Sequence, residues 1–300
     1  MTLRLGVDLG GTKTEIIALR QDSEEPIIRR RIDTKPSYEG VIEGIKFLVD
    51  GVEAELGEKG TVGVGIPGAI SPATGLVKNA NSTWLIGHPL DKDLETALAR
   101  PVRVANDADC LALSEATDGA GAGYDVVWAI ILGTGAGSGI VAYKHLLQGP
   151  NAITGEWAHN PLPFLTEAEK QATPCYCGRA GCIEKMLSGT GLSADYERET
   201  GKKLKGAEIV KAAENGEQAA ETVMQRYEDR LARATAGVIN ILDPHIVVLG
   251  GGVSNIGRLY EALPRLWPKY VFSDTVRTKL AKAKYGDSSG VRGAAWLWND

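Results

Sequence analysis

The sequence lacks several features that would place a protein in a particular class. No apolar run approaches the roughly 20 residues that a membrane span needs. The first residues do not show the charged segment followed by an apolar one that marks a signal peptide. The net charge of -5 provides no positive field for nucleic acid. We therefore expect a cytoplasmic protein with neither a membrane nor a nucleic-acid partner.

Cysteine and histidine are also scarce, with four of each in 300 residues. Three of the cysteines lie close together, which favours a metal site over disulfides and fits a reducing compartment. The P-loop pattern G-x-x-x-x-G-K-[ST] is absent. Glycine, by contrast, is plentiful at 37 residues, and it gathers in tight groups at the ends of expected strands. Such groups indicate places where backbone approaches a ligand closely.

Hydrophobic periodicity predicts a mixed chain of strands and helices. Apolar residues that step by three and four predict a helix starting at Ser37 and a long helix that Asp243-Pro244 ends. The expected strands are 3–9, 14–19, 26–32, 61–66, 102–105, 126–132, 140–143 and 246–249, and the expected helices are 37–56, 90–98, 108–116, 218–242 and 289–297.

This pattern predicts an α/β fold with two lobes that meet near residue 118. The glycine-rich stretch 119–123 is a candidate hinge, and a glycine-turned hairpin opens each half of the chain. The expected N-terminal lobe comprises residues 1–117 with the C-terminal helix at about 287–300. Residues 118–286 are then the C-terminal lobe.

The first glycine turn has the equipment to hold phosphate oxygens. Gly10 and Gly11 leave backbone N–H groups exposed, and Thr12 and Lys13 stand beside them. Asp8, at the end of the preceding strand, is a candidate for holding Mg²⁺. A plain hairpin that uses Gly-Gly for its geometry is the alternative.

Two further glycine groups follow expected strands. Gly133, Thr134 and Gly135 begin a turn that leads into a strand, so the strand-turn-helix context of a dinucleotide fingerprint is missing. Gly251 and Gly252 lead into a helix, whose N-terminus could face an anion or a nucleoside. Packing explains any one such group, but three in one chain favour nucleotide binding.

Asn106 and Asp107 stand where an expected strand ends and a helix begins. Helix capping is the more common role for such a pair. The functional alternative is that Asp107 acts as a general base, because phosphoryl transfer to an alcohol needs an acceptor for the hydroxyl proton.

The segment 156–184 carries the most specific pattern in the chain. His159, Cys175, Cys177 and Cys182 offer one imidazole nitrogen and three sulfurs, which complete a closed tetrahedral zinc shell. The alternative is three buried thiols. Such a metal would fix Glu156 and Glu184 at either end of the segment, where carboxylates could bind paired sugar hydroxyls.

Polar residues elsewhere could add to a sugar site. Asn79, Asn81 and Asn106 offer amides, and the choice between Asn79 and Asn81 stays open. One nitrogen of His159 can bind zinc while the other donates to a sugar oxygen or to a supporting acceptor.

Taken in order, these motifs resemble the ROK family of repressors, open reading frames and kinases. The resemblance runs from residue 3 to about 298, and Ala158, where that family usually has glycine, is a departure from it. It rests on Asp8-Leu9-Gly10-Gly11-Thr12-Lys13, Asn106-Asp107, Gly133-Thr134-Gly135, Gly155-Glu156-x-x-His159 and Cys175-x-Cys177-Gly178-x-x-Gly181-Cys182-x-Glu184.

The resemblance implies a two-lobed, actin-like (ribonuclease H-like) ATPase fold with an active cleft between the lobes. It implies transfer of phosphate from ATP, with Mg²⁺, to the 6-hydroxyl of a hexose, together with structural zinc and a homodimer. Asp107 would be the base. The implied sugar contacts are Asn81, Asn106, Asp107, Glu156, His159 and Glu184, and the implied zinc ligands are His159, Cys175, Cys177 and Cys182.

Fructose is the expected hexose, because the stretch 79–84 and the ending 286–295 look most like the bacterial fructokinases of that family. Mannose, glucose and an N-acetylhexosamine are alternatives, since they differ from fructose by single contacts. A non-catalytic sugar sensor, a repressor and a filament-forming ATPase are the other classes. The expected phosphate turns and Asp107 argue against a sensor. The first strand, which starts at residue 3, argues against a repressor, and the zinc segment argues against a filament-forming ATPase.

Overall fold

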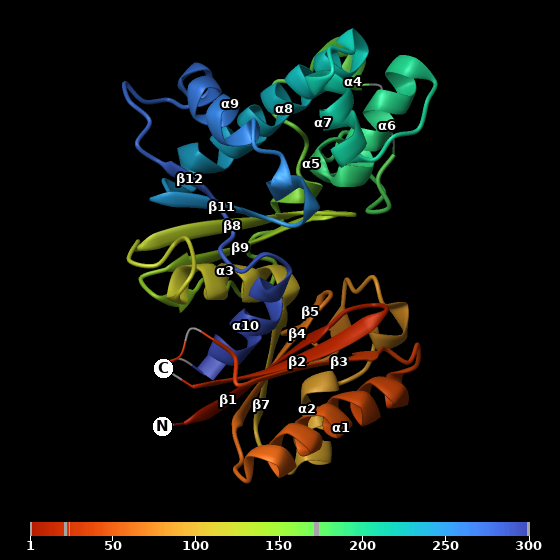
Figure 1. Cartoon of the computed structure of the whole chain (residues 1–300), viewed down its shortest axis with the longest axis vertical. Coiled ribbons are helices and arrows are strands. Elements are labelled where there is room, and N and C mark those ends of the chain that lie inside the picture. Colours follow the sequence, from red (N-terminus) through yellow and green to blue (C-terminus); the bar gives the residue numbers. More distant parts are fainter. Residues whose placement is uncertain (1, 21–22, 24, 171–173, 299–300) are drawn as a thin grey trace. The chain divides into compact units, whose positions relative to one another are not determined.

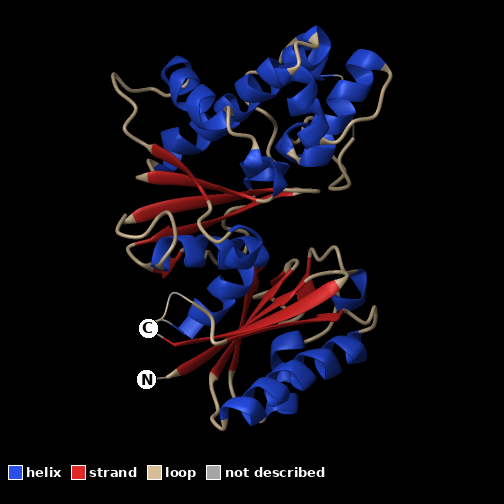
Figure 2. Cartoon of the chain, viewed as in Figure 1, coloured by secondary structure: helices blue, strands red, loops and turns tan. Residues whose placement is uncertain are grey.

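The computed structural model describes residues 2–20, 23, 25–170 and 174–298 (Figure 1). Strands, helices and connecting loops alternate along the whole chain (Figure 2). The chain divides into two compact units, which are described separately below. The first unit comprises Met1–Gly123, Gly139–Thr154 and Asp287–Asp300, and the second comprises Tyr124–Ser138 and Gly155–Gly286.

The first unit contains a five-stranded mixed sheet in the order β3-β2-β1-β4-β7. The first three strands pair antiparallel, and β4 and β7 then add parallel to β1. Three strand ends therefore lie at one edge of the sheet, with Asp8 on β1 beside Gly65 on β4. The strands are β1 (Leu3–Leu9), β2 (Lys13–Arg20), β3 (Ile28–Asp33), β4 (Thr61–Ile66) and β7 (Val102–Asn106), and a separate hairpin pairs β5 (Ala69–Ile70) with β6 (Val77–Lys78).

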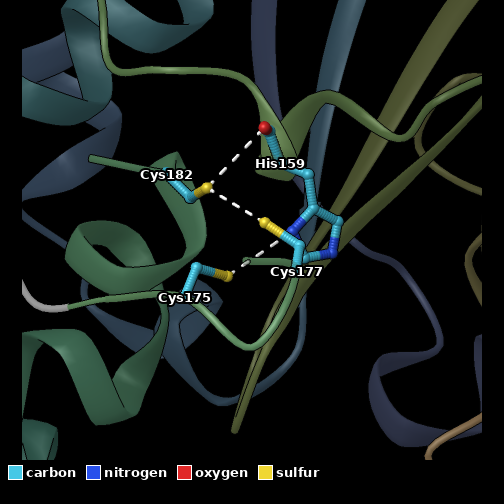
Figure 3. A group of neighbouring side chains, drawn as sticks. All are labelled: His159, Cys175, Cys177 and Cys182. Atoms are coloured by element: carbon cyan, nitrogen blue, oxygen red, sulfur yellow. Dashed lines mark hydrogen bonds between the residues drawn. The ribbon is translucent and has the colours of Figure 1, made fainter. Parts of the chain in front are cut away.

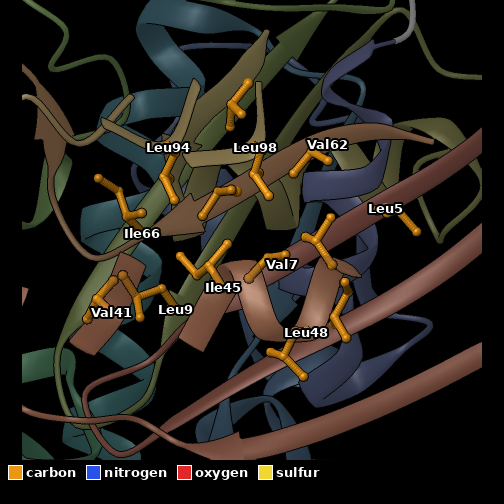
Figure 4. Close-up of a cluster of buried hydrophobic side chains, with 14 of the residues drawn as sticks. Leu5, Val7, Leu9, Val41, Ile45, Leu48, Val62, Ile66, Leu94 and Leu98 are labelled. Carbon is orange, nitrogen blue, oxygen red and sulfur yellow. The ribbon is translucent and has the colours of Figure 1, made fainter. Parts of the chain in front are cut away.

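Helices α1 (Tyr38–Leu56) and α2 (Leu90–Leu98) pack on this sheet through one apolar core. The Ser37 side chain accepts the N–H of Gly40 and caps the start of α1, and Gly57 ends the helix in a left-handed conformation. Figure 4 shows the alternate leucines and valines of β1 meeting the apolar face of α1. Side chains return to the same face about every 3.6 residues in a helix and every 2 residues in a strand, so the apolar residues of α1 and β1 face each other.

A second pair of helices lies in this unit. The helix α3 (Asp107–Thr117) follows β7 directly, and α10 (Ser289–Ala295) returns from the end of the chain. A methyl group at Gly6 would lie 2.1 Å from the carbonyl oxygen of Val291, and one at Gly63 would lie 1.9 Å from that of Ala294. Only glycine lets the backbone of α10 approach the sheet this closely.

The second sheet has the order β10-β9-β8-β11-β12, with β11 parallel to both β8 and β12. Helix α8 (Gln218–Leu242) is the longest element of the second unit, and Asp243 ends it in a left-handed conformation. The remaining strands and helices of the chain are β8 (Val126–Leu132), β9 (Ala136–Ala142), β10 (His145–Leu146), β11 (Ile246–Gly250), β12 (Lys279–Lys282), α4 (Glu167–Lys170), α5 (Ile183–Leu187), α6 (Gly189–Thr200), α7 (Gly206–Glu214) and α9 (Leu259–Leu266). Residues 139–142 of β9 and all of β10 fall within the bounds of the first unit.

Several of the expected elements agree with these bounds, whereas the strand expected at 140–143 is β9 and begins at Ala136, and α4 to α7 were not predicted. The expected strands 3–9, 61–66 and 126–132 and the expected helices 90–98 and 218–242 match the observed elements residue for residue. The expected lobe boundaries stay a prediction. In the contact pattern, Gly139–Thr154 belongs with the first compact unit.

No helix among the described residues combines the length and the apolar character needed to cross a bilayer.

Candidate functional site

The turn between β1 and β2 is a tight hairpin. The N–H of Gly10 donates to the carbonyl of Lys13 over 2.9 Å, and a methyl group on Gly10 would lie 2.9 Å from that same oxygen. Turn geometry thus explains Gly10 by itself. Gly11, Thr12 and Lys13 are exposed. The Lys13 ammonium pairs with Asp33, so a phosphate would have to compete with that carboxylate for it.

Asp8 lies at the end of β1 and carries a perturbed carboxyl group. Burial raises its pKa to about 7, and the negative charges of Asp107 and Glu15 add to the rise against the opposing Arg31. Asp8 and Asp107 are both half-buried. Two interacting carboxyl groups in such a place favour a divalent cation, because it would neutralise their repulsion and accept their oxygens. The first unit therefore fits the predicted Mg²⁺ at Asp8.

Replacing Asp8 with asparagine should stabilise the protein at pH 8 in magnesium-free buffer. Because the folded protein binds this proton more tightly than the unfolded chain, the free energy of unfolding falls as pH rises from about 4 to about 7. The shift from 3.8 corresponds to at most about 4 kcal/mol, and asparagine removes that cost. Urea unfolding of wild type and Asp8→Asn at pH 5 and pH 8 measures the difference.

Asp33→Asn is the matched control, because the Asp33 side chain is 83% exposed and a surface ion pair such as the one with Lys13 adds little stability. A variant Asp8→Asn whose stability follows the same pH curve as wild type would show that Asp8 is not held protonated. Added Mg²⁺ should stabilise wild type and leave Asp8→Asn unchanged.

Asn106 and Asp107 begin α3. The Asn106 side chain accepts the N–H of Ala108 over 2.9 Å and donates to the carbonyl of Gly68 over 3.0 Å. It is thus a helix cap, as the structural alternative expects. Asp107 stands in the first helical position, and its Oδ1 accepts the same N–H over 2.8 Å. The backbone fixes the carboxylate in place, which a positioned base requires.

The two asparagines near residue 80 differ in their backbone. Asn79 has φ +56°, a left-handed conformation that asparagine tolerates better than most residues. Local geometry therefore accounts for Asn79. Asn81 is exposed and has no such conformational reason, which makes it the better candidate for a sugar contact.

The glycine turn after β8 contacts Glu184. The N–H of Gly133 donates to the carbonyl of Gly135 over 3.0 Å, and the N–H of Ala136 donates to Glu184 Oε2 over 3.2 Å. A methyl group on Gly135 would lie 2.9 Å from that oxygen. Glycine at 135 thus lets the carboxylate reach the turn. Glu184 therefore joins the end of the segment 156–184, called the metal segment below, to the glycine turn at 133–135.

Gly251 and Gly252 follow β11 but differ in their surroundings. Gly251 has φ +76°, and a methyl group there would lie 2.6 Å from the carbonyl of Leu132. Close packing of β11 on β8 explains this glycine. A methyl group on Gly252 would meet no atom within 4 Å, so Gly252 is the one of the two that is open to a ligand.

The four predicted zinc ligands lie together, as Figure 3 shows. Their ligand atoms all fall within 4.8 Å of one another. Cys177 Sγ is 3.5 Å from Cys182 Sγ, and Cys175 Sγ is 3.7 Å from His159 Nδ1. A tetrahedron with metal–sulfur bonds of about 2.3 Å has edges of about 3.8 Å, whereas a disulfide bond measures about 2.0 Å. The geometry thus fits four ligands around one ion.

The sulfur atoms differ in how readily they lose a proton. A backbone hydrogen bond from Arg179 is the main cause that lowers the pKa of Cys177, and burial raises that of Cys182. Metal binding would have to deprotonate the buried Cys182, since thiolate is the ligand form. The donor set of three sulfurs and one imidazole suits zinc.

The second nitrogen of His159 has a partner that the sequence analysis did not name. Nε2 lies 3.0 Å from the Tyr176 hydroxyl, and the two rings meet edge to face at 5.1 Å. Tyr176 is thus the supporting partner that a metal-bound histidine usually has. The sequence signal that could have identified Tyr176 is its position between Cys175 and Cys177, two of the predicted ligands. Glu156 makes no side-chain hydrogen bond to any residue that the structure describes.

Comparison with known proteins shows the family of this chain. The sequence profile of the ROK family matches residues 4–300. An N-acetyl-D-glucosamine kinase of Vibrio cholerae is 40% identical over 97% of this chain and 98% of its own length, and one of Pasteurella multocida is 38% identical over 99% of each.

Solved structures agree with the fold. The ROK hexokinase of Thermus thermophilus has a TM-score of 0.86 at 28% identity and covers 98% of this chain and 97% of its own. A ROK glucokinase of Streptomyces griseus, in complex with glucose and AMPPNP, has a TM-score of 0.78 at 26% identity with 98% of each chain covered. These findings confirm the expected α/β, actin-like ATPase fold and the resemblance, and the chain belongs to the ROK family.

Proposed function

We propose that this chain is an ATP-dependent kinase for N-acetyl-D-glucosamine. The broader part of the proposal, a sugar kinase, is supported by its family and by its relatives. The observation that carries the choice of sugar is an identity of 37–40% over 97% of the chain to relatives that bear that name. A hexokinase and a glucokinase among the structural relatives support a hexose as the acceptor.

Fructose, the hexose expected from the sequence, is not supported by these comparisons. The relatives' names favour the alternative that a different hexose, an N-acetylhexosamine, is the substrate. The homodimer and the cytoplasmic location stay predictions.

In the first unit, Asp107 is the proposed base for the attacking hydroxyl. Its carboxylate is held by the start of α3 and can accept the hydroxyl proton as the phosphoryl group transfers. The exposed residues Gly11, Thr12 and Lys13 would contact phosphate oxygens, and Asn81 would contact sugar. Asp8 would hold Mg²⁺, which supplies charge neutralisation to the transferring phosphate.

In the second unit, the metal segment is the proposed sugar binder. Glu156 directly precedes the short helical turn Trp157–His159 and would take sugar hydroxyls. His159 ends that turn and would contact the sugar through Nε2 in exchange for its present partner Tyr176. Glu184, which accepts from the turn at 133–136, would place the sugar-binding segment in register with the nucleotide turn. Gly252 leaves open backbone that would suit the nucleoside. Zinc, when bound, supplies rigidity to this segment and no chemistry.

The measurement that tests the substrate is kcat/KM with ATP for N-acetyl-D-glucosamine, glucose, mannose and fructose. These sugars differ by single hydroxyl or acetamido contacts, and even one small group in an apolar pocket is worth about 10-fold to 200-fold, with hydrogen-bonded groups worth more. N-acetyl-D-glucosamine should therefore exceed glucose and mannose by at least about 10-fold, and fructose by about 100-fold. A higher value for fructose or glucose would replace N-acetyl-D-glucosamine as the assigned substrate. Phosphorus–proton NMR of the product should place the phosphate on the 6-hydroxyl.

A further inference from the structure

A cluster of charged side chains lies buried inside the second unit. Glu169 on α4, Arg230 and Arg233 on α8, and Asp195 on α6 are each between 4% and 7% exposed. Burial alone would raise the pKa of Glu169, but hydrogen bonds from Arg233 and Arg230 lower it to about 2. Buried charges persist only when each one is paired and hydrogen-bonded. The function described above uses none of these residues.

Arg233 is the most connected member of the cluster. Its Nη2 donates to Glu169 Oε1 over 2.8 Å, and its Nε donates to Asp229 over 2.9 Å. Its Nη1 donates to the carbonyl oxygens of Pro163 and Phe164, over 2.9 and 3.0 Å. The planar guanidinium therefore binds the backbone just after the zinc-ligand histidine as well as the helix beyond it. Lysine could not make these contacts at once.

The backbone that Arg233 binds, at residues 163–164, directly follows a stretch of the metal segment that is paired with residues 181–183. The N–H of Leu162 donates to the carbonyl of Gly181, and the N–H of Ile183 donates to that of Asn160, each over 3.0 Å. Pro161 forms a β-bridge with Cys182. The proposed ligands His159 and Cys182 thus belong to two short chain stretches that are bonded to each other. Holding residues 163–164 holds both.

Arg230 extends the cluster toward the nucleotide turn. Its Nε donates to Glu169 over 2.6 Å and its Nη1 to Asp195 over 2.8 Å. Asp195 lies on α6, whose first residues contact the glycine turn. There the N–H of Gly189 donates to the carbonyl of Gly133 over 2.7 Å, and the Thr190 hydroxyl donates to that of Thr134 over 2.9 Å. The buried cluster is therefore bonded both to residues 163–164, which precede Glu184 in the chain, and to helix α6, which follows it.

We propose that Arg233 is a positioning residue for sugar binding, which it supports by clamping residues 163–169 to α8 so that His159 and Cys182 keep their places. The sugar part rests on the function proposed above, whereas the clamp itself concerns the metal segment alone. The clamp also implies that the segment has two independent supports. The ion cluster holds its first part, and the metal holds the part from Cys175 to Cys182.

Arg233→Lys tests the clamp, with Arg258→Lys as the matched control. Arg258 precedes α9 and pairs with Glu221 on α8, the helix that carries Arg233, over 2.7 and 2.9 Å. Among the described residues of the metal segment, Arg258 has no bonded partner. In Arg233→Lys, zinc release to a coloured chelator should quicken at least about 10-fold, and KM for N-acetyl-D-glucosamine should rise about 10-fold. KM for ATP and kcat should each stay within about 3-fold, and the control should match wild type throughout.

A general loss of stability would move all of these quantities together, so the separation of the sugar KM from the ATP KM identifies positioning. Folded Arg233→Lys with wild-type zinc release and wild-type sugar KM overturns the proposal. If Arg233→Lys releases zinc faster but the wild-type protein proves to act on another sugar, the clamp stays supported and only the substrate assignment is removed.

Hydrogen exchange on the wild-type protein tests the same inference without a substitution. After zinc is removed by chelation, amides at 162–169 should keep at least about half of their protection because the ion cluster remains, while amides at 175–180, which precede the stretch bonded to residues 160–162, should exchange freely. Equal loss of protection across 159–182 would overturn the clamp. So would native protein that contains no zinc, since the segment would then have only one support.

Discussion

Asp107→Asn should lower kcat by at least about 100-fold while leaving the sugar dissociation constant within about 3-fold. Asparagine keeps an oxygen that can accept the N–H of Ala108, so the start of α3 should remain intact. It cannot accept a proton from the attacking hydroxyl, and the loss of a general base typically costs about 10²-fold to 10⁴-fold. Steady-state kinetics with ATP, together with calorimetric titration of the sugar, measures both quantities.

Asp91→Asn is the control for this change. Asp91 also lies in the first turn of a helix of the first unit, so the substitution alters the same kind of position without touching the proposed base. A near-normal kcat in Asp107→Asn would remove Asp107 from the mechanism. Because the charge of Asp107 raises the pKa of Asp8, the same variant should also lower the pKa of Asp8.

Cys182→Ser should abolish both zinc binding and sugar binding. Cys182 is buried, and its sulfur lies 3.5 Å from that of Cys177 within the four-ligand cluster. Serine cannot replace a thiolate ligand, and metal binding and local folding are coupled in such segments. The sugar dissociation constant should rise at least about 100-fold, since even the loss of a supporting contact to a ligand costs about 10-fold to 100-fold. Elemental analysis should find less than a tenth of the wild-type zinc.

The nucleotide half of the reaction provides the internal check. ATP binding should stay within about 3-fold, because the exposed turn residues of the first unit do not depend on the metal. Cys110→Ser is the matched control, as Cys110 is a buried thiol on α3 outside the cluster and should leave zinc content unchanged. Unchanged sugar affinity in zinc-free protein would separate the metal from substrate binding.

Secondary structure was predicted well where the local pattern is strong. Helix α8 carries its apolar stripe over 25 residues and ends at Asp243-Pro244, so both its type and its end follow from the sequence. No prediction covered α9, which contains Pro264, or β12, a four-residue strand from Lys279 to Lys282. Proline inside a helix and a short, charged edge strand weaken the periodic signal, so packing decides these elements.

The stripe of α8 also shows the limit of periodicity. Ile241 fits the apolar pattern, yet its side chain is 89% exposed in the second unit. A pattern gives the face of a helix but not where the neighbouring elements stop covering it.

Among the site residues, the cluster of His159 with three cysteines was predictable, because the cysteines lie within eight residues and ligand type is chemically restrictive. Contacts between distant segments were not. Tyr176 meets His159 from 17 positions away, and Glu184 reaches Ala136 from 48 positions away. No spacing rule links such residues, because the fold alone brings them together.

The amino-acid sequence by itself determined the elements, the turns rich in glycine, and the set of groups able to bind metal, since each of these depends on neighbours along the chain. Only the tertiary structure decided the protonation of Asp8 and the bonding of Arg233 to Glu169 across 64 positions. Both depend on burial and on charges contributed by remote segments. Electrostatic energies change steeply with burial and distance, and a sequence contains neither quantity.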